Sequence, residues 1–193
     1  MKTILMALLL PAFACGCMNG LSAAPQDTPP PDERAIFCFT QDADMSKWEI
    51  QDDDVMGGRS QGALTLNEAG NAVFSGTVSL ENDGGFSSVQ HAFAPIDVSN
   101  YRAIVLGLKG DGKTYQLRVD ADPDARHSYA GDFQTSGDWQ TIEILFADLF
   151  AIRHGDRLDL PNYPGQTLAQ IQILIGNGTP ESFRIELDKI WLK

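Results

Sequence analysis

Apolar and polar side chains alternate along several short segments of the chain. Residues 114–120, TYQLRVD, place Tyr115, Leu117 and Val119 on one side and polar side chains on the other. Because successive side chains of a strand point to opposite faces of a sheet, this pattern predicts half-buried β-strands. The same alternation marks residues 72–80, 139–146 and 183–192.

Other segments extend this strand pattern. Residues 103–110 and 171–178 are more uniformly apolar and predict central strands. In residues 183–192 the alternation changes phase at Asp188, which predicts a β-bulge that returns the following apolar side chains, Ile190 and Leu192, to the core. Shorter strand candidates are residues 35–39, 47–50, 63–67, 86–93 and 127–133.

Turns rich in Gly, Asn and Asp separate these segments, for example at residues 67–70 and 82–85. A helical pattern is confined to residues 146–150 and 167–170. A parallel sheet would need longer helices between its strands. The pattern therefore predicts an all-β fold, a β-sandwich or jelly roll of about ten strands with one or two short helices.

The first residues have the layout of an export signal. Lys2 precedes an apolar run too short to cross a membrane, and small residues near cysteine follow. We predict a signal peptide of the lipoprotein type over residues 1–17, with Cys17 lipidated and Cys15 as a second candidate. Ordinary cleavage after residues 22–24, Ser-Ala-Ala, is the alternative. The predicted location is the periplasm or outer cell envelope, with a lipid anchor as the membrane attachment.

Composition changes sharply after the signal. Residues 18–34 are rich in Pro, Ala and polar residues and lack periodicity, which predicts a disordered tether. Residues 35–193 are predicted to form a single β-sandwich domain. Its one cysteine, Cys38, excludes an internal disulfide, and its apolar neighbours predict a buried side chain.

The charge balance restricts the partners. The formal net charge is -12 at pH 7, and 43% of the residues are hydrophobic, which suits a globular core. A surface this acidic repels the phosphates of nucleic acid and of anionic lipids. The composition therefore argues against nucleic-acid binding and favours neutral, basic or metal-like partners.

Residues 52–62, DDDVMGGRSQG, contain a match to the G-x-S-x-G pattern of serine hydrolases. That pattern works where a strand turns sharply into a helix and so exposes the serine. Here Gly62 leads into an alternating strand, so Ser60 is not predicted to be a nucleophile. We instead expect Ser60 to hydrogen-bond to Asp53 or Asp54, and no catalytic residue is predicted.

The apolar and small residues of this stretch have expected structural roles. Gly57 and Gly58 are expected to allow a positive φ or a close approach of another segment. Met56 is expected to fill an apolar pocket. The stretch is therefore interpreted as a structural loop.

Acidic segments raise the question of calcium. Residues 120–124 read D-x-D-x-D, but Ala125 stands where a calcium loop needs glycine, which excludes an EF-hand. The acidic loops at residues 52–54 and 81–83 leave a structural calcium open as an alternative. No His/Cys cluster has ligand spacing, so no metal ligand and no cofactor are assigned.

One predicted strand offers a candidate ligand face. Gln116, Arg118 and Asp120 share its polar side, and Tyr129 and Trp139 belong to neighbouring predicted strands. Polar groups beside an aromatic platform suit a sugar, because the aromatic covers the ring while the polar groups fix hydroxyls. The alternative is a solvated face with Trp139 packed at a sheet edge.

Several of these stretches together resemble the complex I intermediate-associated protein 30 family. The most specific part is V-M-G-G-x-S in residues 55–60, followed about twenty residues later by S-L-E-N-x-G-G-F in residues 79–86. The resemblance runs from about Ile36 to Trp191. Its further segments are Trp48, residues 74–90, residues 110–120, Tyr129, Phe133 and residues 138–149.

The resemblance implies a galactose-binding-domain-like sandwich and a non-catalytic role. Mitochondrial members of the family are assembly chaperones for NADH:ubiquinone oxidoreductase, so a protein partner is implied, here for an exported domain. A carbohydrate-binding module of the same fold is the alternative. The expected partner contact lies on the signature loops, at Asp53, Asp54, Met56, Gly57, Gly58, Ser60, Glu81, Asn82, Gly84, Gly85 and Phe86.

Overall fold

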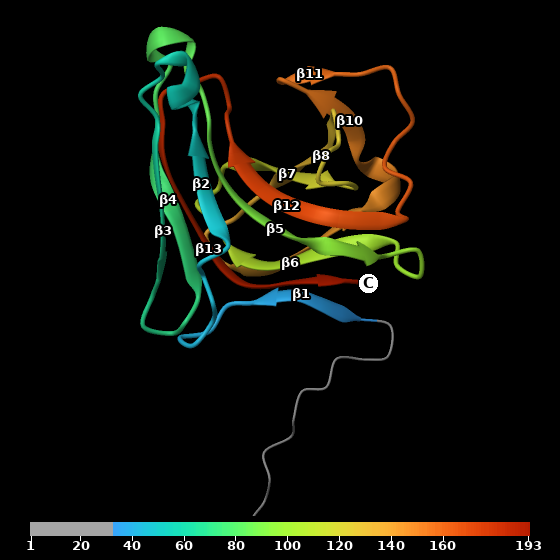
Figure 1. Ribbon diagram of the computed structural model, residues 1–193. Helices are drawn as coiled ribbons and strands as arrows, with labels where there is room; N and C mark the ends of the chain where they lie inside the picture. Colours follow the sequence, from blue (N-terminus) through green and yellow to red (C-terminus); the bar gives the residue numbers. More distant parts are fainter. Residues whose placement is uncertain (1–32) are drawn as a thin grey trace, which may run out of the picture.

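The computed structural model describes residues 33–193, except for the side chains of Val55 and Met56. This part of the chain folds into two antiparallel sheets that enclose one core (Figure 1). The predicted signal peptide at residues 1–17, including lipidation of Cys17, and residues 18–32 of the tether predicted for residues 18–34 lie outside the described residues. Arg34, the last residue of the predicted tether, already belongs to strand β1 (Arg34–Cys38). No helix in residues 33–193 is long and apolar enough to cross a membrane.

The first sheet has six strands. Its order is β3 (Gln61–Leu66), β4 (Ala72–Val78), β13 (Glu181–Leu192), β6 (Ala103–Lys109) and β9 (Trp139–Leu145), with β1 (Arg34–Cys38) also paired to β13. Strand β13 pairs with β4 up to Leu187 and with β1 from Lys189 onward, on the same edge. The long C-terminal strand therefore joins the N-terminal strand to the rest of the sheet.

The second sheet has seven strands. Its order is β11 (Asp156–Arg157), β10 (Phe150–Arg153), β8 (Ser128–Gln134), β7 (Thr114–Asp120), β12 (Thr167–Ile175), β5 (Ser87–Asp97) and β2 (Trp48–Asp52). One face of this sheet packs on the core. The other face points away from the six-stranded sheet, and the loops next to β2 and the β10–β11 hairpin stand on either side of it (Figure 1).

The core lies between the two sheets. The inward side chains of β7 predicted from the alternation, Tyr115, Leu117 and Val119, are all buried. Each such side chain contributes about 1.5–3 kcal/mol relative to an exposed one. Their partners include fully buried side chains of the other sheet, such as Phe74 and Leu106. The prediction of an all-β sandwich is thus confirmed.

The predicted bulge in β13 is also confirmed. The register shifts between Leu187 and Lys189, and Ile190 and Leu192 beyond it are fully buried. The backbone oxygen freed at Asp188 accepts a hydrogen bond from the N–H of Phe39 at 2.8 Å. The irregularity therefore leaves the strand in the core with its side chains in the correct phase.

Two local predictions are wrong. Residues 167–170, predicted as helical, begin strand β12, because Thr167 and Leu168 pair with β5 and so short a segment cannot form a stable helix by itself. The side chain of Cys38 is exposed, not buried. A register irregularity between Ala35 and Phe37 sets the phase of β1, so that apolar Phe37 packs against the core while Cys38 does not. The other predicted helix, at residues 146–150, is a short 3-10 helix, η3 (Phe146–Asp148).

Candidate functional site

The carboxylate of Asp53 holds two loops together. Asp53 is buried at the start of the short helix η1 (Asp53–Met56). Its Oδ1 accepts a hydrogen bond from the N–H of Ser60 at 3.1 Å, and its Oδ2 accepts one from the Ser60 hydroxyl at 2.5 Å. The same Oδ2 accepts bonds from the N–H groups of Gly85 and Phe86 at 2.6 and 3.3 Å. One carboxylate thus joins the β2–β3 loop to the β4–β5 loop.

The neighbouring Asp52 repeats this arrangement. Its Oδ2 accepts a hydrogen bond from the N–H of Gly62 at 2.9 Å, and its Oδ1 accepts one from the hydroxyl of Ser87 at 2.5 Å. We call the two loops joined by these carboxylates, residues 52–62 and 79–87, the loop clasp. It coincides with the two parts of the sequence signature.

Glycines allow the carboxylate of Asp53 to approach this closely. A Cβ at Gly58 would lie 2.2 Å from Oδ1 of Asp53, and a Cβ at Gly84 would lie 2.6 Å from its Oδ2. Gly57 has a φ of +83° and ends helix η1, and its carbonyl accepts a hydrogen bond from the Asn82 side chain at 2.8 Å. The prediction that backbone geometry requires Gly57 and Gly58 is confirmed.

Asp53 is held as a carboxylate. Burial by itself would raise its pKa, but hydrogen bonds from the Ser60 hydroxyl and from the N–H groups of Gly85, Ser60 and Phe86 lower the pKa below the ordinary value of 3.8. The ionised form therefore stabilises the loop clasp at neutral pH.

Ser60 has a structural position. It is buried, and it hydrogen-bonds to Asp53 as predicted, whereas Asp54 is exposed. Its oxygen also accepts a hydrogen bond from the N–H of Ser79 at 3.0 Å. Strand β3 begins at Gln61, so the serine stands where a loop enters a strand. The predicted role of Met56 concerns a side chain outside the described part.

Two carboxylates of the acidic loops, those of Asp52 and Asp53, accept hydrogen bonds within the protein, from loop and strand groups as described above. Glu81 forms an exposed ion pair with Arg59 at 3.2 Å. Across residues 33–193, no group of three or more His, Cys, Asp or Glu side chains has a geometry suited to a metal ion.

A cleft of about 950 Å³ lies on the open face of the seven-stranded sheet. Its floor is formed by strands β5, β12 and β7, and the loop clasp lines one side. The β7–β8 loop and the β10–β11 hairpin line the other side. The residues that line it include Gln51, Asp53, Asp83, Phe86, Gln90, Arg118, Asp120, Arg126, His127, Arg153, His154, Gln170 and Gln172.

Side chains on the floor of the cleft hydrogen-bond to one another. Gln172 donates to the hydroxyl of Ser88 at 2.9 Å and to the side-chain oxygen of Gln51 at 3.3 Å. Gln170 donates to Asp120 at 3.0 Å. These contacts cross strands β2, β5, β12 and β7, so the floor presents an ordered row of amides.

Arg118 connects the cleft with a smaller hollow of about 290 Å³ next to it. Its Nε donates to the side-chain oxygen of Gln116 at 2.6 Å, and Gln116 in turn donates to Asp132 at 2.7 Å. Burial lowers the pKa of Arg118, and the nearby carboxylates of Asp120 and Asp132 oppose that shift. Burial raises the pKa of Asp120, opposed by a Ser128 hydrogen bond and by Arg118.

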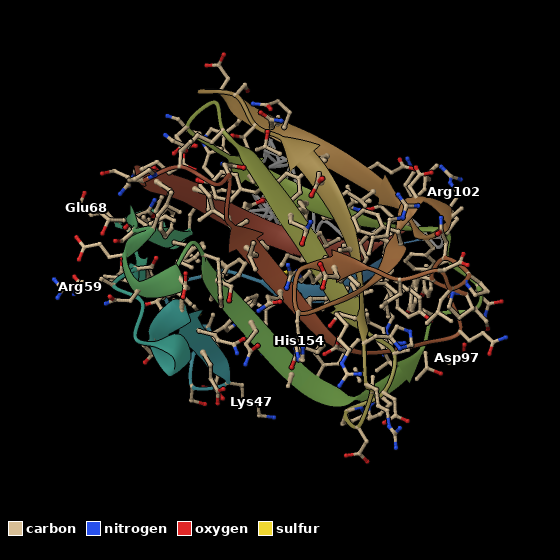
Figure 2. The ribbon with its side chains drawn as sticks, turned by 90° about the horizontal axis from the view of Figure 1, so that it is seen from above. Lys47, Arg59, Glu68, Asp97, Arg102 and His154 are labelled. Carbon is tan, nitrogen blue, oxygen red and sulfur yellow. The ribbon has the colours of Figure 1, made fainter. Side chains whose placement is uncertain are left out.

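Cationic and imidazole side chains gather on the hairpin side of the cleft and on the floor strand next to it, β7. We call Arg118, Arg126, His127, Arg153 and His154 the basic wall. His154 adopts a left-handed φ of +52° in the two-residue turn between β10 and β11. Figure 2 looks down on this side of the molecule and shows His154 near its middle, whereas Arg59 and Arg102 lie toward opposite margins.

The structure brings together three of the five residues predicted for the ligand face. Gln116, Arg118 and Asp120 do share the open face of β7. Tyr129 does not, because it pairs with core-facing Val119 and packs against Tyr163. Trp139 does not either: it lies, half-exposed, on β9 at the edge of the other sheet, which agrees with the alternative that placed it at a sheet edge.

Several cleft residues were missed at the sequence level. The glutamines of β12, Gln170 and Gln172, interrupt an apolar strand at every second position, which is the pattern of a polar face. The His154–Gly155 pair stands where a tight hairpin turn needs unusual backbone angles. Arg126 and Arg153 carry no comparable sequence signal.

Comparison with known proteins gives one family and a common fold. The profile of the family described as Complex I intermediate-associated protein 30 matches residues 37–187. The mouse (Mus musculus) protein "Complex I intermediate-associated protein 30, mitochondrial" is 24% identical over 144 residues, covering 63% of this chain. The matched part is 44% of that relative, so the chain spans less than half of its length.

Solved structures agree on the architecture. A family 11 carbohydrate-binding module of a Clostridium thermocellum cellulase superposes with a TM-score of 0.59 at 15% identity, covering 83% of this chain and 93% of that one. The same type of module in complex with a β-1,3-1,4-mixed-linked tetrasaccharide gives 0.59 at 16%, covering 83% and 94%. An agarase gives 0.58 at 10%, covering 83% of this chain and 24% of that one. At these identities the similarity concerns the fold.

Proposed function

The chain belongs to the complex I intermediate-associated protein 30 family, and we propose that it is a non-catalytic binding domain with the cleft as its binding surface. One observation carries this proposal: the loop clasp, which contains the sequence signature, forms one side of the cleft through Asp53, Asp83, Gly85 and Phe86. The residues of the signature therefore stabilise the conformation of one side of the binding surface.

A protein partner, in an assembly-type role, is the first candidate occupant because the family name refers to association with an intermediate of complex I. We further propose that the domain acts in the cell envelope, on the basis of the export signal predicted at residues 1–17. Fractionation of cells that express the chain with and without Cys17→Ala tests this location. Release of the variant from the membrane fraction is the expected result.

Site-specific photo-crosslinking in the native cell tests the protein partner. A photoreactive residue at Gln90, on the cleft floor, is expected to capture one protein that mass spectrometry identifies. The matched control is the same residue at Trp139, exposed on the other sheet. Equal capture at both positions, or none at either, would contradict a protein occupant of the cleft.

Carbohydrate is the second candidate, and the chemistry of the cleft favours it. Cores of protein interfaces are depleted of charged residues and enriched in aromatic ones. Here the floor carries Gln90, Gln170 and Gln172, which both donate and accept hydrogen bonds as sugar hydroxyls do. Calorimetric titration with soluble glycans tests this candidate: Gln90→Ala is expected to weaken binding, whereas Trp139→Ala is expected to leave it unchanged.

The non-catalytic assignment has its own test at Ser60. Its hydroxyl donates to Asp53 and accepts from Ser79, so it is committed to the loop clasp. We expect no ester hydrolysis that depends on this residue. Hydrolysis of p-nitrophenyl acetate that is lost in a folded Ser60→Ala variant would overturn the assignment.

A further inference from the structure

The basic wall is a cluster of cationic and imidazole side chains in a chain that is strongly acidic as a whole. The protein has a formal net charge of -12, yet three arginines and two histidines line the hairpin side of the cleft and the adjoining floor strand β7. Salt limits the reach of the surrounding negative charge, since the Debye length is about 8 Å at physiological ionic strength. A ligand inside the cleft therefore meets the local cations first.

Most hydrogen-bond donors of the basic wall have no partner among the described residues. Among residues 33–193, the five ion pairs involve Arg59, Arg102, Lys113, Arg184 and Lys193, all outside the basic wall. In the same part of the chain, Arg126 and Arg153 make no side-chain hydrogen bond, and Arg118 uses only its Nε. The Nε2 atom of His127 is buried and lacks a hydrogen-bond partner among the described residues.

Three of the four carboxylates that line the cleft already accept hydrogen bonds within the protein. Asp52 and Asp53 accept hydrogen bonds from the loop clasp, and Asp120 accepts one from Gln170. The fourth, Asp83, is an exposed residue of the loop clasp, on the side of the cleft opposite the β10–β11 hairpin. The hydrogen-bonding capacity left for a ligand is therefore weighted toward positively charged donors, which suits an anion.

The floor of the cleft adds a second constraint on the chemistry of the ligand. Its glutamine amides can donate and accept at once, which matches hydroxyl groups better than it matches a simple anion. A peptide would also bring apolar side chains, and the large apolar residues that line the cleft are Phe86, Ile152 and Leu174. The polar floor and the basic wall together call for a ligand that carries both hydroxyls and carboxylates.

We propose that the cleft binds an acidic glycan of the uronic-acid class. Its carboxylates lie against Arg118 and Arg153, and its hydroxyls lie on the floor formed by Gln90, Gln170 and Gln172. This inference rests on the proposed function in one respect, that the cleft is the binding surface. It goes further by fixing the chemical class of the ligand.

The test is calorimetric titration of the full chain with oligogalacturonate, and with neutral gluco-oligosaccharides of equal length. Oligogalacturonate is expected to bind and neutral oligomers to bind at least about tenfold more weakly, because charge-assisted hydrogen bonds are the stronger ones. Arg118→Gln and Arg153→Gln are each expected to weaken binding about tenfold. Arg153 is exposed, so its replacement leaves folding intact.

Arg102→Gln is the matched control, because it removes the same charge from an exposed ion pair away from the cleft. It is expected to change affinity less than about twofold.

Equal binding of neutral oligomers, unaffected by Arg118→Gln, would overturn the acidic class while leaving the cleft as a carbohydrate site. Tight binding of poly-L-glutamate, lost in both arginine variants, would overturn the sugar class and assign the wall to peptide carboxylates. Absence of binding to every probe would overturn the inference, and crosslinking at Gln90 would still test the cleft as a protein site.

Discussion

The loop clasp and the basic wall face each other across the cleft and use polar side chains in opposite ways. In the loop clasp, the buried carboxylate of Asp53 accepts four hydrogen bonds from two loops. In the basic wall, Arg126 and Arg153 leave their donors open toward the cleft. A polar group whose hydrogen bonds are satisfied internally stabilises the fold, whereas a group with open capacity is available for a ligand.

The pKa values of two carboxylates that line the cleft, Asp53 and Asp120, are shifted in opposite directions. The pKa of Asp53 lies below its ordinary value of 3.8, so its ionisation adds stability above that pH, and this stability is lost as the pH falls through the folded-state pKa. Burial raises the pKa of Asp120 above 3.8, so stability is lost as the pH rises from 3.8 through the raised value. Ionised Asp53 supports the fold, while ionised Asp120 opposes it.

The largest expected effect is the loss of the clasp carboxylate. Asp53→Ala leaves the four donors from Ser60, Gly85 and Phe86 without their acceptor, and we expect the free energy of unfolding to fall by about 3 kcal/mol or more. Urea denaturation measures this loss. Asp54→Ala, an exposed neighbour with the same charge, should change stability by less than about 0.5 kcal/mol. Similar losses in both variants would mean that the loop clasp does not depend on Asp53.

The second-largest loss of stability is expected when a methyl group is added beside the carboxylate of Asp53. In Gly58→Ala the new Cβ would lie 2.2 Å from Oδ1 of Asp53, so the loop must shift, and we expect a loss of about 2 kcal/mol. The control is Gly137→Ala, whose Cβ would meet nothing within 4 Å. Thermal unfolding of the two variants compares them. An unchanged melting temperature for Gly58→Ala would show that the loops are not closely packed there.

Replacing the carboxylate of Asp120 by a neutral amide should have a smaller effect on stability, and this effect should be stabilising. Asp120→Asn removes a charge that burial disfavours, so we expect a gain of about 0.5–1 kcal/mol at neutral pH. The gain should vanish well below pH 3.8, where the wild-type carboxyl is protonated in both states. Urea denaturation across this pH range measures the difference. A gain that persists in acid would point to packing as its cause.

The smallest effect is expected in the basic wall. Arg153→Gln changes an exposed side chain that makes no ion pair in the described part of the chain, so its stability should stay within about 0.5 kcal/mol of the wild type. The measurement is the midpoint of urea denaturation at constant slope. A marked destabilisation would show that Arg153 supports the hairpin and would erase the contrast with the loop clasp.

Much of the fold could be predicted from the sequence because strand patterns are local. The two-residue alternation located β7 at residues 114–120 to the residue, and the phase change at Asp188 predicted the bulge in β13. A hydrogen bond from Ser60 to Asp53 or Asp54 was also predicted, since both are close in the sequence, and the structure shows Asp53 as the acceptor. Residues 167–170 were misassigned because their pairing partner, β5, lies far away in the sequence.

The sequence by itself determined the fold class, the family signature and the structural nature of the G-x-S-x-G match, because each depends on residue order over short distances. The tertiary structure alone decided which polar residues from distant segments meet in the cleft. Trp139 and Gln116 fall on different sheets, while Gln90 and Arg118, from two separate strands, and His154, from a hairpin turn, line one cleft. The physical reason is strand order: hydrogen-bonded pairing brings distant segments together, and the side-chain pattern within one segment carries no information about its neighbour in the sheet.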